Sequence, residues 1–326
     1  MDRRTFVTSL ATILAASGRA EAALTAQVWR VGSLHATPPA LSAPIIAHFE
    51  KGLASRGHIK DRTTTIEYVF RPGSRDDLRE SARTLGQRVD LIVAWGTIAT
   101  VAAKEANVTI PVVFSPVGFP VAIGMVDSLR RPGGNFTGIS FEAADDTYGK
   151  RLQILKEIVP DAIRVAALGH AEDPNIGPAL ETAHRIAPSL GVTVLDVKIR
   201  AVSDLEPVFT EMRNRRVHGV LVIAGAFMFA NSKPLADLAI THRLPTMHGL
   251  REGVIAGGLA SLGPDLLVMA EQAAGYVDKI LRGAKPGDLP VEQPSRYEVY
   301  INMKSAKALG LTMPPALLAR ADQVIE

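Results

Sequence analysis

Short apolar runs alternate with stretches of helical spacing along most of this chain. The run Leu91 to Trp95 is apolar and partly β-branched, and at Gly96-Thr97 it gives way to apolar residues at helical spacing. This pattern predicts a buried strand that leads directly into a helix. Strands that alternate with helices of this length indicate βαβ units and therefore parallel sheets. Similar strand-like runs occupy residues 112–115, 165–168, 192–195 and 220–223.

Segments rich in glycine and proline interrupt this alternation three times. They lie at residues 131–140, 257–261 and 285–290, and such breaks are typical of connections between structural units. We therefore predict an α/β fold with two doubly wound parallel-sheet lobes joined by a three-crossing hinge. The expected boundaries are residues 28–139 plus 256–284 for lobe 1, and residues 140–255 plus 285–326 for lobe 2.

The candidate binding residues follow from this architecture, because ligands of open α/β sheets bind beyond the carboxyl ends of the strands. The helix after Gly96 also presents unpaired N–H groups and a positive partial charge, which favour an anionic group. In the first half of the chain the candidates are Ser33, Leu34, His35, Trp95, Gly96, Thr97, Val117, Gly118 and Phe119. In the second half they are His170, Gly225, Phe227, His248 and Gly249.

Several aromatic residues gather at or just beyond the predicted strand ends. They predict an aromatic box that stacks a planar ligand, although each ring could instead belong to the core of a lobe. Our hypothesis is a planar aromatic or branched acid whose carboxylate meets the N–H groups at Gly96-Thr97, and in addition His35, His248 or Arg251. The rings of the box are Trp95, Phe119, Phe141, Phe227 and Phe229.

The sequence offers little support for metal or catalytic chemistry. The chain has 8 histidines, but none stands in a spacing typical of zinc ligands, so no metal site and no cofactor are expected. Nucleophile-elbow, dinucleotide-binding and P-loop motifs are likewise missing from the sequence. We therefore do not expect an enzyme.

Composition narrows the functional class further. The chain has 326 residues and a formal net charge of +3, with no basic block, so nucleic acid is not an expected partner. There are 0 cysteines, which excludes disulfides, thiolate chemistry and a lipid-modified amino-terminal cysteine.

The first residues resemble an export signal. Arg3-Arg4 precedes the apolar run Phe6 to Ala16, and Ala20-Glu21-Ala22 matches a cleavage site, so residues 1–22 are predicted to be a signal peptide. The paired arginines partly match a twin-arginine signal. The apolar run is too short for a membrane span, which needs about 20 residues. These features predict a protein exported to the periplasm.

Five segments in this order resemble the substrate-binding proteins of ABC transporters, in the tryptophan- and tyrosine-binding branch with the type I periplasmic binding protein fold. The resemblance runs from about Trp29 to the carboxyl terminus. The segments are Ala94-Trp95-Gly96-Thr97, Ile110-Pro111-Val112-Val113-Phe114, residues 129–138 (LRRPGGNFTG), residues 257–265 (GGLASLGPD) and residues 284–294 (AKPGDLPVEQP).

The resemblance implies a periplasmic receptor, expected to be a monomer, that captures a small-molecule ligand between its lobes and delivers it to an ABC permease in the inner membrane. It adds Ser140 and Phe141 to the expected ligand contacts and supports the loops at Ser33-Leu34-His35, Trp95-Gly96-Thr97 and Val117-Gly118-Phe119. Many relatives have Asp-Pro where this chain has Phe119-Pro120. The aspartate that would pair with a ligand amine is therefore missing at that position.

Two other functions remain open at this point. The protein could be a sensory receptor that presents its closed form to a membrane kinase or chemoreceptor, or it could be an exported α/β enzyme. Permease and ATPase genes beside this gene would favour transport. A ligand that is recovered chemically unchanged would disfavour the enzyme.

Overall fold

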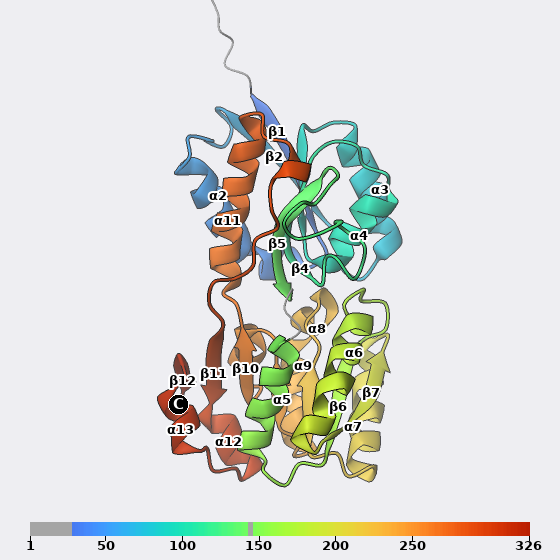
Figure 1. The fold of residues 1–326 in the computed structure, drawn as a ribbon, viewed down its shortest axis with the longest axis vertical. Helices are drawn as coiled ribbons and strands as arrows, with labels where there is room; N and C mark the ends of the chain where they lie inside the picture. The colour runs from blue at the N-terminus through green and yellow to red at the C-terminus, as the bar shows by residue number, and fades with distance from the viewer. Residues whose placement is uncertain (1–27, 143–145) are drawn as a thin grey trace, which may run out of the picture.

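The computed structural model describes residues 28–142 and 146–326, which form two lobes arranged along one axis (Figure 1). The predicted signal peptide, residues 1–22, lies outside the described residues. Each lobe has a central sheet with helices on both faces, as the alternating pattern predicts. In the described part of the chain, no helix combines the length and the apolar character needed to cross a membrane.

Lobe 1 is built on a five-stranded sheet in which every neighbouring pair of strands is parallel. All five residues of the strand Leu91–Trp95 are buried, because helices cover both faces of the sheet. In sheet order the strands are β2 (Thr64–Phe70), β1 (Trp29–His35), β3 (Leu91–Trp95), β4 (Val112–Gly118) and β5 (Phe136–Glu142).

Two pairs of helices cover this sheet. The apolar faces of α3 (Arg75–Gly86) and α4 (Thr97–Glu105) form one core with it, and α2 (Pro39–Ala54) and α11 (Leu266–Leu281) form the other. Helices α2 and α11 pack so closely that a Cβ atom at Gly52 would lie 2.8 Å from the Cβ of Ala274. This contact joins two segments that are far apart in the sequence into one rigid layer.

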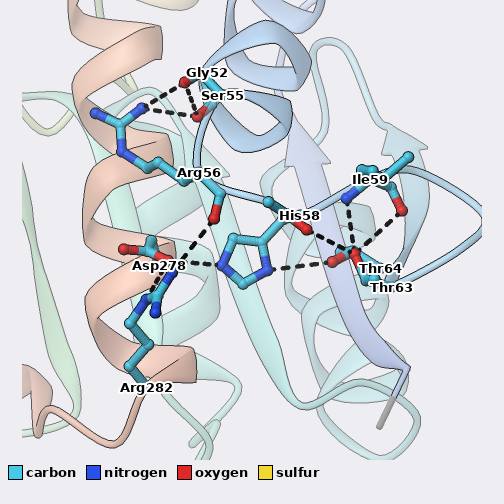
Figure 2. A network of polar contacts seen from close by, with 10 residues as sticks. Gly52, Ser55, Arg56, His58, Ile59, Thr63, Thr64, Asp278 and Arg282 are labelled. Atoms are coloured by element: carbon cyan, nitrogen blue, oxygen red, sulfur yellow. Dashed lines mark hydrogen bonds and ion pairs between the residues drawn. The ribbon is translucent and has the colours of Figure 1, made fainter. Parts of the chain in front are cut away.

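Polar contacts fasten the ends of the same two helices (Figure 2). Nε2 of His58 lies 2.8 Å from Oδ1 of Asp278, and Arg282 donates to the same carboxylate oxygen at 2.7 Å. Arg282 also donates to the backbone carbonyl of Arg56 at 3.3 Å. Because α11 begins at the hinge, these contacts make it move with lobe 1.

Lobe 2 contains a seven-stranded sheet that is parallel except for one pair. Strands β10 and β11 are antiparallel, because the chain leaves the lobe after β10 and re-enters it with β11. In sheet order the strands are β12 (Gln323–Ile325), β11 (Glu298–Asn302), β10 (Ala260–Gly263), β9 (Thr246–His248), β8 (Gly219–Val222), β6 (Arg164–His170) and β7 (Thr193–Ile199).

The helices of lobe 2 also lie on both faces of its sheet. One core includes residues of α5 (Asp146–Ile158), α6 (Ile176–Ile186), η1 (Ala187–Leu190), α12 (Met303–Leu309) and α13 (Pro315–Ala319). The opposite core includes residues of α7 (Leu205–Asn214), α8 (Ala226–Ala230) and α9 (Ser232–Thr241). The remaining short elements are η2 (Val202–Asp204), α10 (Arg251–Ile255) and, in lobe 1, η3 (Pro286–Asp288).

The chain passes between the lobes three times, but at other residues than predicted. The segment 256–263 belongs to lobe 2, because β10 pairs with β9 and β11, and the chain passes to lobe 1 only between β10 and α11. Residues 285–292 stay with lobe 1, where Glu292 donates its N–H to Gly138 and accepts from Ser140. Strand β5 likewise extends to Glu142 within the sheet of lobe 1. The glycine-rich segments indicate where the chain bends. They do not indicate to which lobe each residue belongs, because that depends on strand pairing.

Candidate functional site

A cavity lies between the two lobes at the carboxyl ends of their strands, and we call it the inner cavity. Its lining includes three aromatic rings, several aliphatic side chains and a few uncharged polar groups. None of these lining residues carries a charge. From lobe 1 they are Thr37, Ile45, Trp95, Gly96, Thr97, Pro116, Phe141 and Leu266, and from lobe 2 they are Asn175, Ala224, Gly225, Ala226, Phe229 and Leu250.

Trp95, the last residue of β3, forms part of this wall and is also anchored in lobe 1. Its ring meets Phe49 edge-on at 5.4 Å and stacks on His35 at 5.7 Å, measured between ring centroids. Its indole N–H donates to Oγ of Ser33 at 2.9 Å. The indole donor is therefore already used, and the ring offers the cavity an apolar surface of fixed orientation.

Ser33 and His35 support the wall from behind and do not line the cavity. Both are buried, and Oγ of Ser33 lies 2.8 Å from Nε2 of His35. Burial lowers the pKa of His35 to about 3, so its imidazole is neutral at physiological pH. The sequence predicts that His35 meets a ligand carboxylate, but this residue does not line the inner cavity.

The amino end of α4 supplies hydrogen-bond donors to the cavity. Gly96 has φ of 91°, a conformation that favours glycine, and it turns the chain from β3 directly into the helix. No side chain caps this helix, so its first N–H groups remain available to a ligand. The hydroxyl of Thr97 accepts the N–H of Gly118 at 3.1 Å, which ties the loops after β3 and β4 together.

The loop after β6 belongs to lobe 2 and faces the amino end of α4 in lobe 1. The side-chain amide of Asn175 donates to Oγ1 of Thr97 at 2.9 Å, so a hydrogen bond joins the two lobes directly. Asp173, two residues earlier, is 6% exposed and accepts the N–H of Asn175 at 2.9 Å. Burial raises the pKa of Asp173 to about 6, and the hydrogen bond from Asn175 opposes part of that rise. The structure is thus in a closed arrangement of the lobes.

A buried ion pair spans the first crossing of the hinge. Arg151 of α5 lies against Glu142 at the end of β5, and both side chains are fully buried. Arg151 also donates to the carbonyl of Leu262 at 2.9 Å and to that of Gly249 at 3.4 Å. Burial raises the pKa of Glu142, although the Arg151 charge acts in the opposite direction.

Comparison with known proteins assigns the molecule to a family. The family model for "ABC transporter substrate binding protein" matches residues 39–325. The chain belongs to the ABC transporter substrate binding protein family. It is accordingly a small-molecule-binding protein of an ABC transporter and not an enzyme, and proteins of this family typically act outside the cytoplasm.

Individual relatives agree with this assignment. A structure from Streptococcus pneumonia, an ABC domain in complex with L-Trp, superimposes on this protein with a TM-score of 0.85 at 25% identity. The superposition covers 92% of this chain and 100% of that one. The tyrosine-binding protein of Clostridioides difficile (strain R20291) is 26% identical over 265 residues, which is 81% of this chain and 75% of the relative.

A ligand-free, open structure of a substrate-binding protein with adhesive properties from Clostridium difficile gives a lower TM-score of 0.67. It is 21% identical and covers 91% of this chain and 99% of its own.

Of the residues predicted from this binding protein's sequence, six line the inner cavity. They are Trp95, Gly96, Thr97, Phe141, Gly225 and Phe229. Two more, His170 and Phe227, stack on each other with ring centroids 4.3 Å apart beside a second space between the lobes. We call that space the outer cavity, and its lining also includes Pro38, Ile98, Asp173 and Ala226.

Other predicted residues are part of the framework of the binding protein. Leu34 and Val117 are buried in the core of lobe 1, and Phe119 packs on Tyr148 at 6.0 Å within a core of lobe 2. Ser140 is buried in β5 beside the cavity-lining Phe141. Gly118 faces Asn175 across the closed interface. Of these residues only Phe119 follows a strand, the others lie within β1, β4 and β5, and none of them lines the inner cavity.

The other two side chains expected to meet a ligand carboxylate, His248 and Arg251, lie outside the lining of the inner cavity. His248 and Gly249 line a small space behind the inner cavity, and burial lowers the pKa of His248 to about 4. Arg251 makes two hydrogen bonds to Asp265, at 2.7 and 2.8 Å.

Sequence reasoning missed several lining residues, among them Thr37, Asn175 and Leu250. The same rule of strand carboxyl ends could have found Asn175, because the loop after β6 runs on from His170 to the start of α6. Among the described residues, no group of three or more His, Asp or Glu side chains is arranged to hold a metal ion.

Proposed function

We propose that this protein is a periplasmic receptor of an ABC importer that captures a small planar carboxylate or amino acid between its lobes. The main support for the proposal is the inner cavity. Trp95, Phe141 and Phe229 line it, and so does the start of α4, whose first N–H groups are not capped by a side chain. The rings favour a planar ligand, and the N–H groups favour its carboxylate.

The ligands of the relatives support the same class. One relative with a TM-score of 0.85 was crystallised with L-Trp, and another is a tyrosine-binding protein. Both ligands combine a flat ring with a carboxylate. In this proposal the predicted residues Trp95, Gly96, Thr97, Phe141, Gly225 and Phe229 contact the ligand, together with Thr37 and Asn175, which the sequence did not indicate.

The route of delivery is part of the proposal. Arg3-Arg4, the apolar run and Ala20-Glu21-Ala22 support export to the periplasm. There the protein, acting as a monomer, would close on its ligand and present the closed form to a permease in the inner membrane. Because both lobes contribute to the cavity wall, closure of the lobes would enclose the ligand.

Fluorescence titration tests the ligand class. The protein has 2 tryptophans, so a Trp29→Phe variant leaves Trp95 as the single reporter within the cavity wall. We expect its emission to change on addition of aromatic amino acids or aromatic acids and to stay constant with sugars. Mass spectrometry of small molecules released from the purified protein would identify the natural ligand. A response to sugars alone would contradict the proposal.

A further inference from the structure

The hydroxyl of Thr97 lies where lobe 1, lobe 2 and the inner cavity meet. Thr97 is the first residue of α4, is 5% exposed and lines the cavity. Its Oγ1 accepts the backbone N–H of Gly118 at 3.1 Å, within lobe 1, and a side-chain N–H of Asn175 at 2.9 Å, from lobe 2. A single oxygen atom therefore holds a loop of lobe 1 and also the contact between the lobes.

These two hydrogen bonds use both acceptor positions of the hydroxyl. A threonine hydroxyl has two lone pairs and one proton to donate. Because N–H groups occupy both lone pairs, a further hydrogen bond is possible only if the hydroxyl donates its proton. Within residues 28–142 and 146–326, no group accepts that proton, whereas the hydroxyl of Thr100 on the same helix donates to the carbonyl of Gly96 at 2.9 Å. The acceptor for Thr97 must come from the space that this residue lines.

The surroundings of Asn175 establish the direction of its hydrogen bond to Thr97. Nδ2 of Asn175 also lies 3.5 Å from the carbonyl oxygen of Ala224, and the reversed amide would bring its own oxygen toward that carbonyl. Asn175 is 1% exposed, and its backbone N–H is held by Asp173 at 2.9 Å. The amide is therefore a donor to Thr97 with little freedom to turn away.

Closure of the lobes decides whether both lone pairs are used. Thr97 and Gly118 belong to the same lobe, so their hydrogen bond does not depend on closure. Asn175 belongs to lobe 2 and occupies the second lone pair only when the lobes meet. We propose that Asn175 is a positioning residue that, on closure, fixes the Thr97 hydroxyl as a donor to the ligand's carboxylate. This inference rests on the proposed function and adds to it a link between closure and recognition of the acid group.

The start of α4 favours the same ligand group. No side chain caps this helix, so its first N–H groups are donors beside the Thr97 hydroxyl. A carboxylate accepts from several such donors at once, and a charged acceptor strengthens each bond. A carboxamide of the same shape has one acceptor oxygen and directs its own N–H groups toward the remaining donors. The arrangement therefore selects an acid over its amide.

Calorimetric titration at about pH 6.5, where ligand amines stay protonated, provides the test. The ligands are L-tryptophan, L-tyrosine and 3-phenylpropionate, each compared with its primary amide. We expect Thr97→Val to lower the preference for the acid at least about tenfold, because a hydrogen bond to a charged group is lost. Asn175→Ala, which leaves the hydroxyl in place, should lower the same preference about threefold, because the hydroxyl proton is then free to rotate.

The double variant shows whether Asn175 acts through Thr97. If it does, Asn175→Ala changes the preference for the acid in the wild type but not in Thr97→Val. A direct contact of Asn175 with the carboxylate would lower the preference equally in both backgrounds and would overturn the inference. A purely structural role would also overturn it, because acid and amide would then lose affinity equally.

Two further variants serve as controls. Thr97→Ser keeps the hydroxyl and should keep the wild-type preference. Thr100→Val removes a buried hydroxyl from the same helix at a position that does not line the cavity, and it should also keep that preference. Should Thr97→Val not fold, Thr97→Ala takes its place. A wild type that binds these compounds without preferring the acids contradicts the inference alone, whereas a wild type that binds none of them contradicts the proposed ligand class.

Discussion

Trp95 and Phe229 line the same cavity but differ in what else holds them. Trp95 is 5% exposed and packs on Phe49 and His35 within lobe 1, so its removal would damage the core as well as the ligand site. Phe229 is only partly buried, on the short helix α8. Phe229 is therefore the cleaner probe of the aromatic wall, although the sequence draws attention first to Trp95.

Replacing Phe229 with alanine should weaken the binding of an aromatic ligand by about tenfold, because one ring contact and its buried area are lost. The melting temperature of the ligand-free protein should change little. Calorimetry and thermal unfolding measure the two quantities. Phe229→Leu serves as the control, since it keeps most of the apolar area and should recover part of the affinity. A large loss of ligand-free stability would instead place this ring in the core.

At the scale of elements, the hinge depends on how β5 and α5 are joined. Glu142 at the end of β5 and Arg151 in α5 form a buried ion pair across the first crossing, and Arg151 also reaches the carbonyls of Leu262 and Gly249 near the second. The pair thus connects two of the three passages between the lobes.

Breaking this pair from one side should be strongly destabilising. Glu142→Gln leaves the Arg151 charge buried without its anion and should lower the free energy of unfolding by about 3–5 kcal/mol. The double variant Glu142→Gln/Arg151→Met removes both charges and should be more stable than the single variant. Chemical denaturation of the four proteins in this cycle measures the coupling. Additive effects of the two substitutions would show that the pair is not coupled.

At the scale of the whole molecule, closure brings lobe 1 into contact with the loop after β6. Gly118 has no side chain, and a Cβ atom there would lie 2.5 Å from Oδ1 and 2.9 Å from Cγ of Asn175. The Asn175 side chain cannot easily move aside, because it is held by Thr97. The closed form therefore requires glycine at this position.

Gly118→Ala should leave the ligand-free protein folded but prevent full closure. Gly118 does not have positive φ, so its backbone accepts alanine, and the clash arises only when the lobes meet. We expect at least about tenfold weaker ligand binding and no ligand-induced decrease in the radius of gyration in solution scattering. The control is Gly177→Ala on α6, where an added Cβ meets nothing within 4 Å. Normal closure of Gly118→Ala would refute this view of the interface.

Much of the fold was predictable from local pattern, and the candidate site only in part. The alternation of strands and helices predicted two α/β lobes, and the Gly96-Thr97 turn predicted a helix start at the cavity. The pattern did not reveal that β10 joins the sheet of lobe 2, because its partners β9 and β11 are chosen by pairing between distant segments. It also did not distinguish Phe119, which packs in a core, from Phe229, which lines the cavity.

The sequence by itself therefore determined the order of the elements, the two-lobed class and the strand ends at which a ligand could bind, because periodicity and turn-forming residues act over a few positions. Only the tertiary structure decided which side chains face one another. Thr97 and Asn175 are 78 residues apart, yet they share a hydrogen bond once the lobes close. Burial then determined the chemistry of the side chains, since the desolvation that makes His35 neutral and isolates the Asp173 carboxylate exists only in the packed molecule.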